Sequence, residues 1–246
     1  MDGAALVNDE SHPGARVSEH HADVSGGWLR PAVFGAMDGL VSNVGLIAGV
    51  GGGGVAPRTI IVAGFAGLVS GAISMALGEY TSVKTQSEQV AAELEKERRE
   101  QALNPALEED ELAHLWMARG LPSDLAHEVA RVVHTNPTEA LRVHAREELG
   151  IDPGEQPSPW TAAISSFLCF ALGALVPIVP YLMGFQELWT ALIAGGIGLF
   201  AAGAFVARFT HRRWWYSGTR QLALGVAAAG VTYLIGRLIG TAAGSL

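Results

Sequence analysis

Residues 31–50 read PAVFGAMDGLVSNVGLIAGV, and residues 59–80 read TIIVAGFAGLVSGAISMALGEY. Each stretch is about 20 residues long and almost entirely apolar, as a helix that crosses a membrane must be. Asp38 is an acid inside the first stretch, and Glu79 lies near the end of the second. The two stretches therefore predict a pair of transmembrane helices joined by a short turn through the four glycines at 51–54.

Three further apolar stretches of similar length follow at residues 160–183, 188–209 and 221–239. The chain is 49% hydrophobic and 16% charged with a mean hydropathy of +0.28, whereas soluble domains carry about 25% charge. This composition argues against a soluble enzyme and against a disordered chain. We predict an all-α membrane protein with five transmembrane helices per subunit.

The charged residues are concentrated in one insert between the second and third predicted spans. Of 24 acids, 14 lie between residues 88 and 148. The net charge of −8 also argues against nucleic acid as a partner. We predict four regions, which are a disordered cytoplasmic tail at 1–29, transmembrane helices 1–2 at 30–83, a cytoplasmic helical metal-binding domain at 84–158, and transmembrane helices 3–5 at 159–246.

The basic residues set the predicted orientation. The loop at 207–220 contains four arginines and no acid, and the positive-inside rule places such a loop in the cytosol. Counting back along the spans, the N-terminus and the insert are also cytoplasmic, and the C-terminus is outside. Residues 1–29 contain no apolar run of the kind found in a signal peptide, and arginines outnumber lysines 14 to 2. These features favour a bacterial plasma membrane.

The insert is predicted to form four helices at 82–103, 104–120, 123–134 and 138–149, with Asn104 and Ser123 as N-caps. Acids and a histidine recur three or four positions apart, so they share helix faces. Such faces are often simply solvated. Three facing helices can instead build a carboxylate metal site, and mixed carboxylate and imidazole ligands suit Fe(II), Mn(II) or Zn(II). The candidate ligands are Glu97, Glu100, Glu108, Glu111, His144 and Glu148.

Asp38 is an ionisable residue within a span, and such residues usually mark an ion path or a proton relay. Asp38 follows Arg30 by eight residues and Met75 precedes Lys84 by nine, so at about 1.5 Å per residue both lie 12–14 Å into their helices. Antiparallel helices can therefore place the carboxylate and the thioether at one level. Glu79 lies one turn nearer the cytosol, where it can receive an entering ion.

Asn43 and Ser74 can line the same path, or can form hydrogen bonds between helices. Met75 taken alone is more often a packing residue than a ligand. A carboxylate paired with a thioether favours a transition metal over sodium or calcium. Because five spans make a small bundle, a path between two subunits is easier to build than one within a subunit, which favours a homodimer.

Three motifs resemble one known family. Residues 34–43 (FGAMDGLVSN) and 71–80 (GAISMALGEY) resemble the first-span and second-span signatures of the vacuolar iron transporter family, and residues 145–150 (AREELG) match the end of its cytoplasmic domain. We identify the chain as similar to prokaryotic-type members of this family from about Trp28 onward.

The resemblance implies a homodimer that moves Fe(II) and related divalent ions out of the cytosol in exchange for protons. It implies a path along the dimer interface through Asp38 and Met75. The family's cytoplasmic glutamates fall on Glu97, Glu100, Glu108, Glu111 and Glu148. Two positions depart from some members, because His144 replaces a methionine and Gly67 replaces an acid. These departures bear on ion preference and proton coupling.

The sequence thus predicts a proton-coupled exporter of Fe(II), with Mn(II) and Zn(II) as further candidate substrates. We expect no prosthetic group and no enzymatic activity, since the sequence shows no nucleophile–base arrangement and no phosphate-binding loop. The expected partners are divalent ions, protons, membrane lipid and a second copy of the chain. The alternative is a membrane-anchored iron or manganese buffer or sensor that does not transport.

Overall fold

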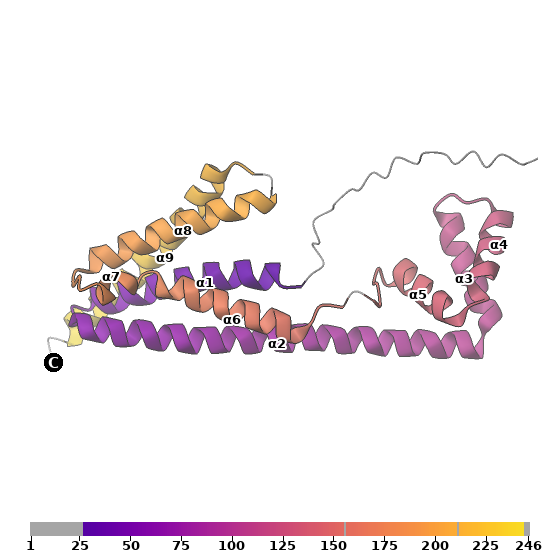
Figure 1. Cartoon of the computed structure of the whole chain (residues 1–246), viewed down its shortest axis with the longest axis horizontal. Coiled ribbons are helices and arrows are strands. Elements are labelled where there is room, and N and C mark those ends of the chain that lie inside the picture. The colour runs from indigo at the N-terminus through magenta and orange to yellow at the C-terminus, as the bar shows by residue number, and fades with distance from the viewer. Residues whose placement is uncertain (1–26, 155, 211, 244–246) are drawn as a thin grey trace, which may run out of the picture.

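The computed structural model describes residues 27–154, 156–210 and 212–243. The predicted tail at 1–29 therefore lies almost wholly outside the described residues. Every regular element in the described ranges is a helix. The helices, shown in Figure 1, are α1 (Leu29–Gly52), α2 (Pro57–Leu103), α3 (Pro105–Ala118), α4 (Ser123–His134), α5 (Pro137–Glu148), α6 (Pro159–Leu175), α7 (Val179–Leu182), α8 (Leu188–Thr210) and α9 (Trp214–Ala243).

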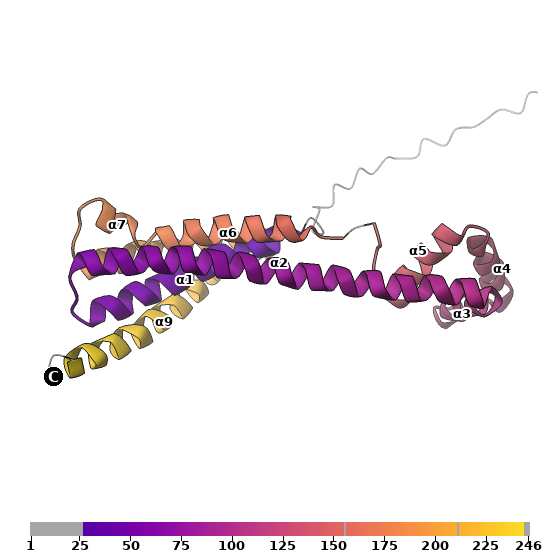
Figure 2. The same cartoon turned by 90° about the horizontal axis from the view of Figure 1, so that it is seen from below.

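Helices α1, α2, α6, α8 and α9 lie side by side in one bundle, as Figures 1 and 2 show. Close contacts between the helices give their directions. Gly35 of α1 lies against Ser166 of α6. Gly39, one turn further along α1, lies against Phe170, one turn further along α6, so the two helices are parallel. The same comparison makes α9 parallel to α1, whereas α2 and α8 run the opposite way. The five helices therefore traverse the bundle in alternating directions, with the α1–α2 turn at the end away from the insert.

Within the described residues, α1, α2, α8 and α9 are long and apolar enough to cross a membrane. The predicted third span, 160–183, differs from expectation because it is not one continuous helix. Helix α6 has 17 residues, and the four-residue helix α7 follows after a break around Pro177. Proline lacks the backbone N–H that would continue the helix. At 1.5 Å per residue α6 covers only about 26 Å, so a crossing at this position would need α7 as well.

Helix α2 is a single helix of 47 residues. It begins at the α1–α2 turn, runs through the bundle and continues into the insert (Figure 1). This confirms that residues 82–103 continue the second apolar stretch. Helix α9 begins at Trp214, so it includes residues 214–220, which were predicted as part of a loop.

The insert is built from α3, α4 and α5 against the far end of α2. Buried Leu112, Ala113, Ala126 and Ala130 form the core that joins α3 to α4. Asn136 caps α5, because its side-chain oxygen accepts hydrogen bonds from two backbone N–H groups. Asn104 lies at the N-cap position of α3 without such a bond, and Ser123 is the first residue of α4 rather than its cap. The predicted N-cap position of Asn104 is therefore confirmed, although its side chain makes no capping hydrogen bond, and the predicted cap at Ser123 is wrong.

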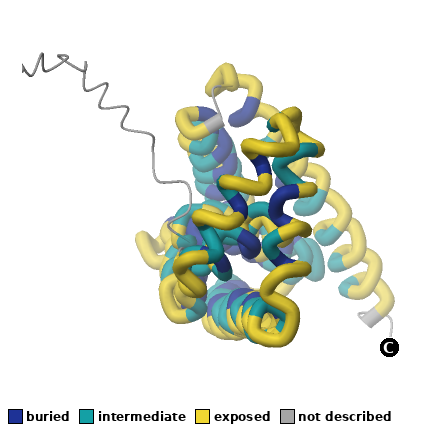
Figure 3. The backbone as a smooth tube through the Cα atoms, turned by 90° about the vertical axis from the view of Figure 1, so that its right-hand side faces the viewer, coloured by how far each residue is buried: buried dark blue, intermediate teal, exposed yellow. Residues whose placement is uncertain are grey.

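Glycines allow the closest helix contacts in the bundle. A Cβ atom at Gly236 of α9 would overlap the carbonyl oxygen of Gly49 in α1, and a Cβ at Gly39 would overlap that of Phe170 in α6. Small residues let helices approach in this way in lipid. Figure 3 shows the buried positions between the helices and the largely exposed helix that leads to the C-terminus. Its exposed side chains are mostly apolar, including Leu238 at 70% exposure, as a lipid-facing surface requires.

Candidate metal centre

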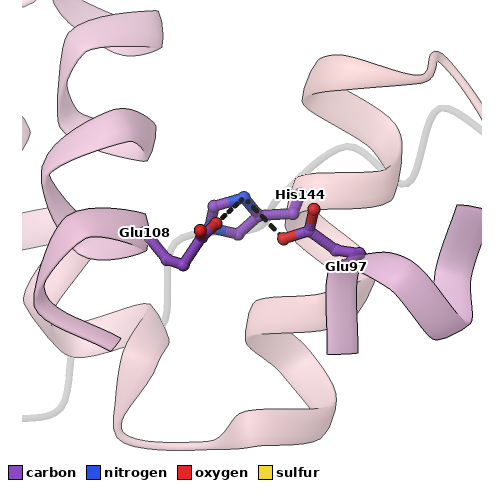
Figure 4. A group of neighbouring side chains, drawn as sticks. All are labelled: Glu97, Glu108 and His144. Atoms are coloured by element: carbon purple, nitrogen blue, oxygen red, sulfur yellow. Dashed lines mark ion pairs between the residues drawn. The ribbon is translucent and has the colours of Figure 1, made fainter. Parts of the chain in front are cut away.

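Three helices of the insert bring Glu97, Glu108 and His144 together, as Figure 4 shows. Glu97 comes from α2, Glu108 from α3 and His144 from α5. All three residues are buried, with exposed fractions of 7%, 6% and 0%. The Nδ1 atom of His144 lies 3.1 Å from Oε1 of Glu97 and 4.0 Å from Oε2 of Glu108.

The spacing of these atoms suits a metal ion. One ligand atom from each residue lies within 4.8 Å of the other two. Ligand bonds to a divalent transition metal are about 2.0–2.2 Å long, so donor atoms in one coordination shell are separated by roughly 3–4 Å. A cation between the two carboxylates and the imidazole would therefore reach all three with small adjustments of the side chains.

The local sequence explains how the three side chains meet. Helix α2 ends at Leu103, and the chain turns at Asn104, where Pro105 begins a new helix in another direction. Glu108 then lies in the first turn of α3, where the helix dipole favours a negative charge. The cap at Asn136 begins α5, and two turns later the helix presents His144 to both carboxylates.

Burial and like charges shift the pKa values in this cluster. Loss of solvent raises the pKa of Glu108, and the neighbouring charges of Glu97 and Glu111 raise it further. Burial is also the main cause that raises the pKa of Glu148, although its hydrogen bond with His144 acts in the opposite direction. Carboxylates held this close favour either a proton or a metal cation as a counter-charge.

All five predicted glutamates lie around a single cavity of about 320 Å³. Glu148 contacts His144 directly, with Oε1 2.6 Å from Nδ1. Glu100 is partly exposed and lies 3.9 Å from the ammonium group of Lys96. The cavity is lined by Glu93, Glu97, Glu100, Glu108, Glu111 and Glu148, together with Lys96, Asn104, Leu107 and Leu149. The structure therefore brings the predicted ligands of the insert to one place.

Sequence reasoning missed His134. Its Nε2 atom lies 3.3 Å from Nε2 of His144, and the two rings are perpendicular. The available signal was a pair of histidines on either side of the helix break at Asn136–Pro137, but that signal does not reveal which way the rings face. His114, which follows Glu111 by one turn, faces elsewhere and lies 3.4 Å from Asp110.

In the membrane bundle, Asp38 and Ser42 are exposed on α1. The Ser42 hydroxyl donates a hydrogen bond to Oδ1 of Asp38 at 3.1 Å. Both side chains face away from the core of the single chain, although the helix that carries them is apolar. An exposed carboxylate at this depth would meet lipid unless another surface covers it.

The level of Met75 follows from contacts between α1 and α2. A Cβ at Gly67 would lie 3.3 Å from Oδ1 of Asn43, so these residues face one another. The two helices are antiparallel, and Gly67 also contacts Leu46, so Asp38 lies level with the turn of α2 formed by residues 72–75. Met75 is half-buried against the cluster formed by Ala72, Phe170 and Ala174.

The other predicted path residues differ in exposure. Asn43 is buried, and its amide donates a hydrogen bond to the carbonyl of Ala174 in α6 at 2.5 Å. Its Oδ1 atom has no hydrogen-bond partner among the described residues. Ser74 is exposed and Glu79 is half-buried on α2. Asn43 therefore forms a hydrogen bond between α1 and α6, which is one of the two roles predicted for it.

Comparison with known proteins places the chain in a family. The model of the VIT family matches residues 29–237. This chain belongs to the VIT family. It is 38% identical to a vacuolar iron transporter of Acanthamoeba castellanii over 76% of the chain and 72% of that protein. It is 34% identical to vacuolar iron transporter homolog 1 of Oryza sativa subsp. japonica over 87% of the chain and 74% of that protein.

A third relative covers more of both sequences. Vacuolar iron transporter 1 of Oryza sativa subsp. japonica is 28% identical over 98% of the chain and 94% of its own length. VIT family proteins are transporters and not enzymes, so this member is an integral membrane transport protein. Gly67 faces the buried amide of Asn43. According to the sequence resemblance, some members of the VIT family have an acid at the position of Gly67.

Proposed function

We propose that the chain is a proton-coupled exporter of Fe(II) from the cytosol, with Mn(II) as a second substrate. Metal collects at Glu97, Glu108 and His144, passes Glu79, binds at Asp38 and Met75, and leaves on the opposite side. The buried carboxylate–imidazole cluster carries this proposal, because it gathers metal ligands around Glu97, which lies on the same helix as Met75. The relatives named iron transporters support Fe(II) as the substrate.

The ligand types support the proposed ions. Carboxylates with one imidazole suit Fe(II), Mn(II) and Zn(II), whereas a calcium site is usually built from oxygen ligands alone. Met75 adds a soft thioether at about the level of the Asp38 carboxylate, which favours a transition metal during passage. The same carboxylate can bind a proton after the metal leaves, so protonation from the outer side would promote release.

We propose that the exposed face of α1 meets a second copy of the chain. Asp38 and Ser42 form a polar pair on this otherwise apolar face, and Ser74 and Gly78 are exposed on α2. In a homodimer two such faces would enclose a polar path, and the carboxylates would no longer meet lipid. This arrangement accounts for the exposure of Asp38 without requiring it to face lipid tails.

We infer that the N-terminal end of α1 and the insert face the cytosol. The arginine-rich segment between α8 and α9 supports this orientation, since α8 ends and α9 begins at the end of the bundle that the insert extends from (Figure 1). The relatives are named vacuolar, so the predicted bacterial plasma membrane has no support from them. The proposal therefore specifies export from the cytosol and leaves the receiving compartment open.

The decisive experiment is Fe(II) uptake by vesicles that contain the purified chain, with an acidic interior as the driving force. Only molecules with the insert facing outward can take up metal, and protease cleavage of the insert reports their fraction. We expect uptake that follows the proton gradient and is abolished by Asp38→Asn. Glu187→Gln, in the exposed turn before α8, is the matched control. Wild-type uptake by the Asp38→Asn variant would refute this mechanism.

A buffer or sensor remains the second candidate, because the metal centre lies well away from the bundle. Met75 and Glu97 are 22 positions apart on one helix, which corresponds to about 33 Å. A buffer would bind metal without uptake into vesicles. The Glu97→Gln/Glu108→Gln variant separates the two functions, since it slows transport by an exporter but removes only binding from a buffer.

A further inference from the structure

We infer that His134 is a positioning residue that holds His144 in the tautomer able to bind metal through Nδ1. The inference deepens the proposed function and rests on it, because it concerns the same metal centre. His134 is the last residue of α4, and sequence analysis did not select it.

The hydrogen-bond directions define the tautomers. Nδ1 of His134 lies 2.9 Å from the carbonyl oxygen of Ala130, and a carbonyl oxygen can only accept. The hydrogen of a neutral His134 ring is therefore on Nδ1, and its Nε2 is an acceptor. Nε2 of His144 lies 3.3 Å from that acceptor, so His144 donates from Nε2. Without a cation, Nδ1 of His144 donates its own hydrogen to the carboxylate of Glu148 at 2.6 Å. A cation that displaces this hydrogen would meet the Nδ1 lone pair of a ring whose remaining hydrogen is held on Nε2 by His134.

The Nδ1 atom of His144 points to the correct group of atoms. Nδ1 of His144 faces carboxylate oxygens of Glu148, Glu97 and Glu108 at 2.6, 3.1 and 4.0 Å. All of these oxygens accept hydrogen bonds and bind cations. The opposite tautomer would direct an N–H at the place where the metal must lie, and His144 would then be unable to act as a ligand.

His134 is placed to act through His144 and not as a further ligand of the same ion. It contacts Nε2, which is on the other side of the imidazole ring from the carboxylates. The perpendicular rings, with centroids 5.2 Å apart, allow the His144 N–H to point at the nitrogen lone pair in the plane of the His134 ring. Metal-binding histidines commonly donate their second N–H to an acceptor, usually a carboxylate, a backbone carbonyl or water, which orients the ring and raises its basicity. The His134 nitrogen takes this place here.

His134 is half-buried, and contacts on two sides hold it in place. Ala130, whose carbonyl holds Nδ1, is fully buried in the core that joins α3 to α4. The cap at Asn136 begins α5 directly afterwards, so only a short turn separates the two helices that carry the histidines. The ring of His134 is therefore held from the protein core on one side and from the metal centre on the other.

The test measures Co(II) binding to the full-length protein in detergent, by titration and by the visible absorption of the bound ion. His134→Gln keeps an acceptor near the Nε2 position, His134→Asn is polar but too short to reach His144, and His134→Leu removes the acceptor. His127→Gln is the matched control, because His127 lies on the same helix and its Nδ1 likewise contacts a backbone carbonyl, at 2.7 Å.

We expect His134→Leu and His134→Asn to weaken Co(II) binding about 10- to 100-fold and to change the absorption bands. His134→Gln should restore most of the affinity, and His127→Gln should bind as the wild type does. If the leucine variant does not fold, the comparison of Gln with Asn decides. Equal affinity and equal spectra for the Gln and Asn variants would overturn the inference.

The design also separates this inference from the proposed metal centre. If the wild type does not bind Co(II), or if Glu97→Gln/Glu108→Gln binds it normally, the metal centre itself is refuted and the role of His134 with it. If the double variant loses binding while His134→Leu and His134→Asn retain it, the metal centre stands and only the inference about His134 is overturned.

Discussion

The Nδ1 atom of His144 lies 3.1 Å from Oε1 of Glu97, although α3 and α4 separate the helices that carry the two residues. This contact attaches α5 to the long helix α2 inside a cavity lined by acids. Both groups are buried, so the contact stabilises the fold only when a cation or a proton neutralises the excess negative charge of the cluster.

Replacement of Glu97 by Gln should weaken metal binding more than tenfold, which is about 1.4 kcal/mol, because a buried anionic ligand is lost. Glu88→Gln is the control, since Glu88 is exposed on the same helix and pairs with Lys84 at 3.4 Å. Isothermal titration with Mn(II) measures both affinities. Equal affinities for the two variants would show that Glu97 is not a ligand.

Glu108 should limit the stability of the metal-free protein. Burial raises the pKa of Glu108, so this carboxyl group binds a proton more readily in the folded state than in the unfolded chain. The charged form of Glu108 near neutral pH therefore lowers the stability of the folded state. This cost disappears as the pH falls through the raised pKa. Glu108→Gln should therefore raise the melting temperature at pH 7 by about 2–4 °C for each kcal/mol recovered. Scanning fluorimetry without metal measures the shift, and a lower melting temperature would contradict the prediction.

Metal affinity should fall on acidification. The raised pKa values of Glu108 and Glu148 mean that protons compete with metal at a higher pH than for ordinary carboxylates. Each proton displaced on binding weakens the apparent affinity about tenfold per pH unit below the relevant pKa. Titrations with Mn(II) between pH 7.5 and 5.5 test this, and an affinity independent of pH in that range would contradict it.

The contact of α1 with α9 depends on Gly236. Gly236→Leu should destabilise the bundle by about 1–3 kcal/mol, because the new side chain would overlap the backbone of Gly49. Gly230→Leu in the same helix has open space and serves as the control. Thermal melting in detergent compares them, and equal melting temperatures would show that α9 does not pack closely on α1.

The exposed contact of His127 with Asp110 should depend on pH. Nε2 of His127 lies 3.2 Å from Oδ1 of Asp110, and hydrogen bonds to Ser123 and Asp110 raise the pKa of His127. Because the pKa of His127 is raised on folding, this contact stabilises the insert fully at a pH below the pKa that His127 has in the unfolded chain. The stabilisation is lost as the pH rises through the pKa that His127 has in the folded protein. Asp110→Asn should lower the pKa of His127 in a proton NMR titration. An unchanged titration would contradict the assignment.

The sequence predicted the bundle well, because hydropathy reports directly which segments can be surrounded by lipid. It did not predict the break after Leu175, since Pro177 can kink a membrane helix or end it, and packing decides between the two. The start of α9 at Trp214 was also hidden, because arginines and interfacial aromatic residues are compatible with both loop and helix.

The spacing of the acids predicted which residues could share a face, and the structure places all five glutamates around one cavity. Spacing alone could not predict that Glu97 and Glu108 would be buried, since the same pattern occurs on solvated helices. The contact of His134 with His144 was missed for a related reason. It depends on how the turn at Asn136 directs α5 back along α4, and no periodicity in the sequence records that direction.

Helix α2 joins the two parts of the molecule without a loop, so it can act as a mechanical lever. Glu97 lies about 33 Å beyond Met75 along it, and a tilt of roughly 5° about Met75 would move Glu97 by about 3 Å. That displacement equals the distance between neighbouring ligand atoms in a metal site. In the proposed transporter, any tilt of α2 on loading of the insert would therefore also move the segment that packs against α6 and α1, because one helix connects the metal centre with the proposed membrane path.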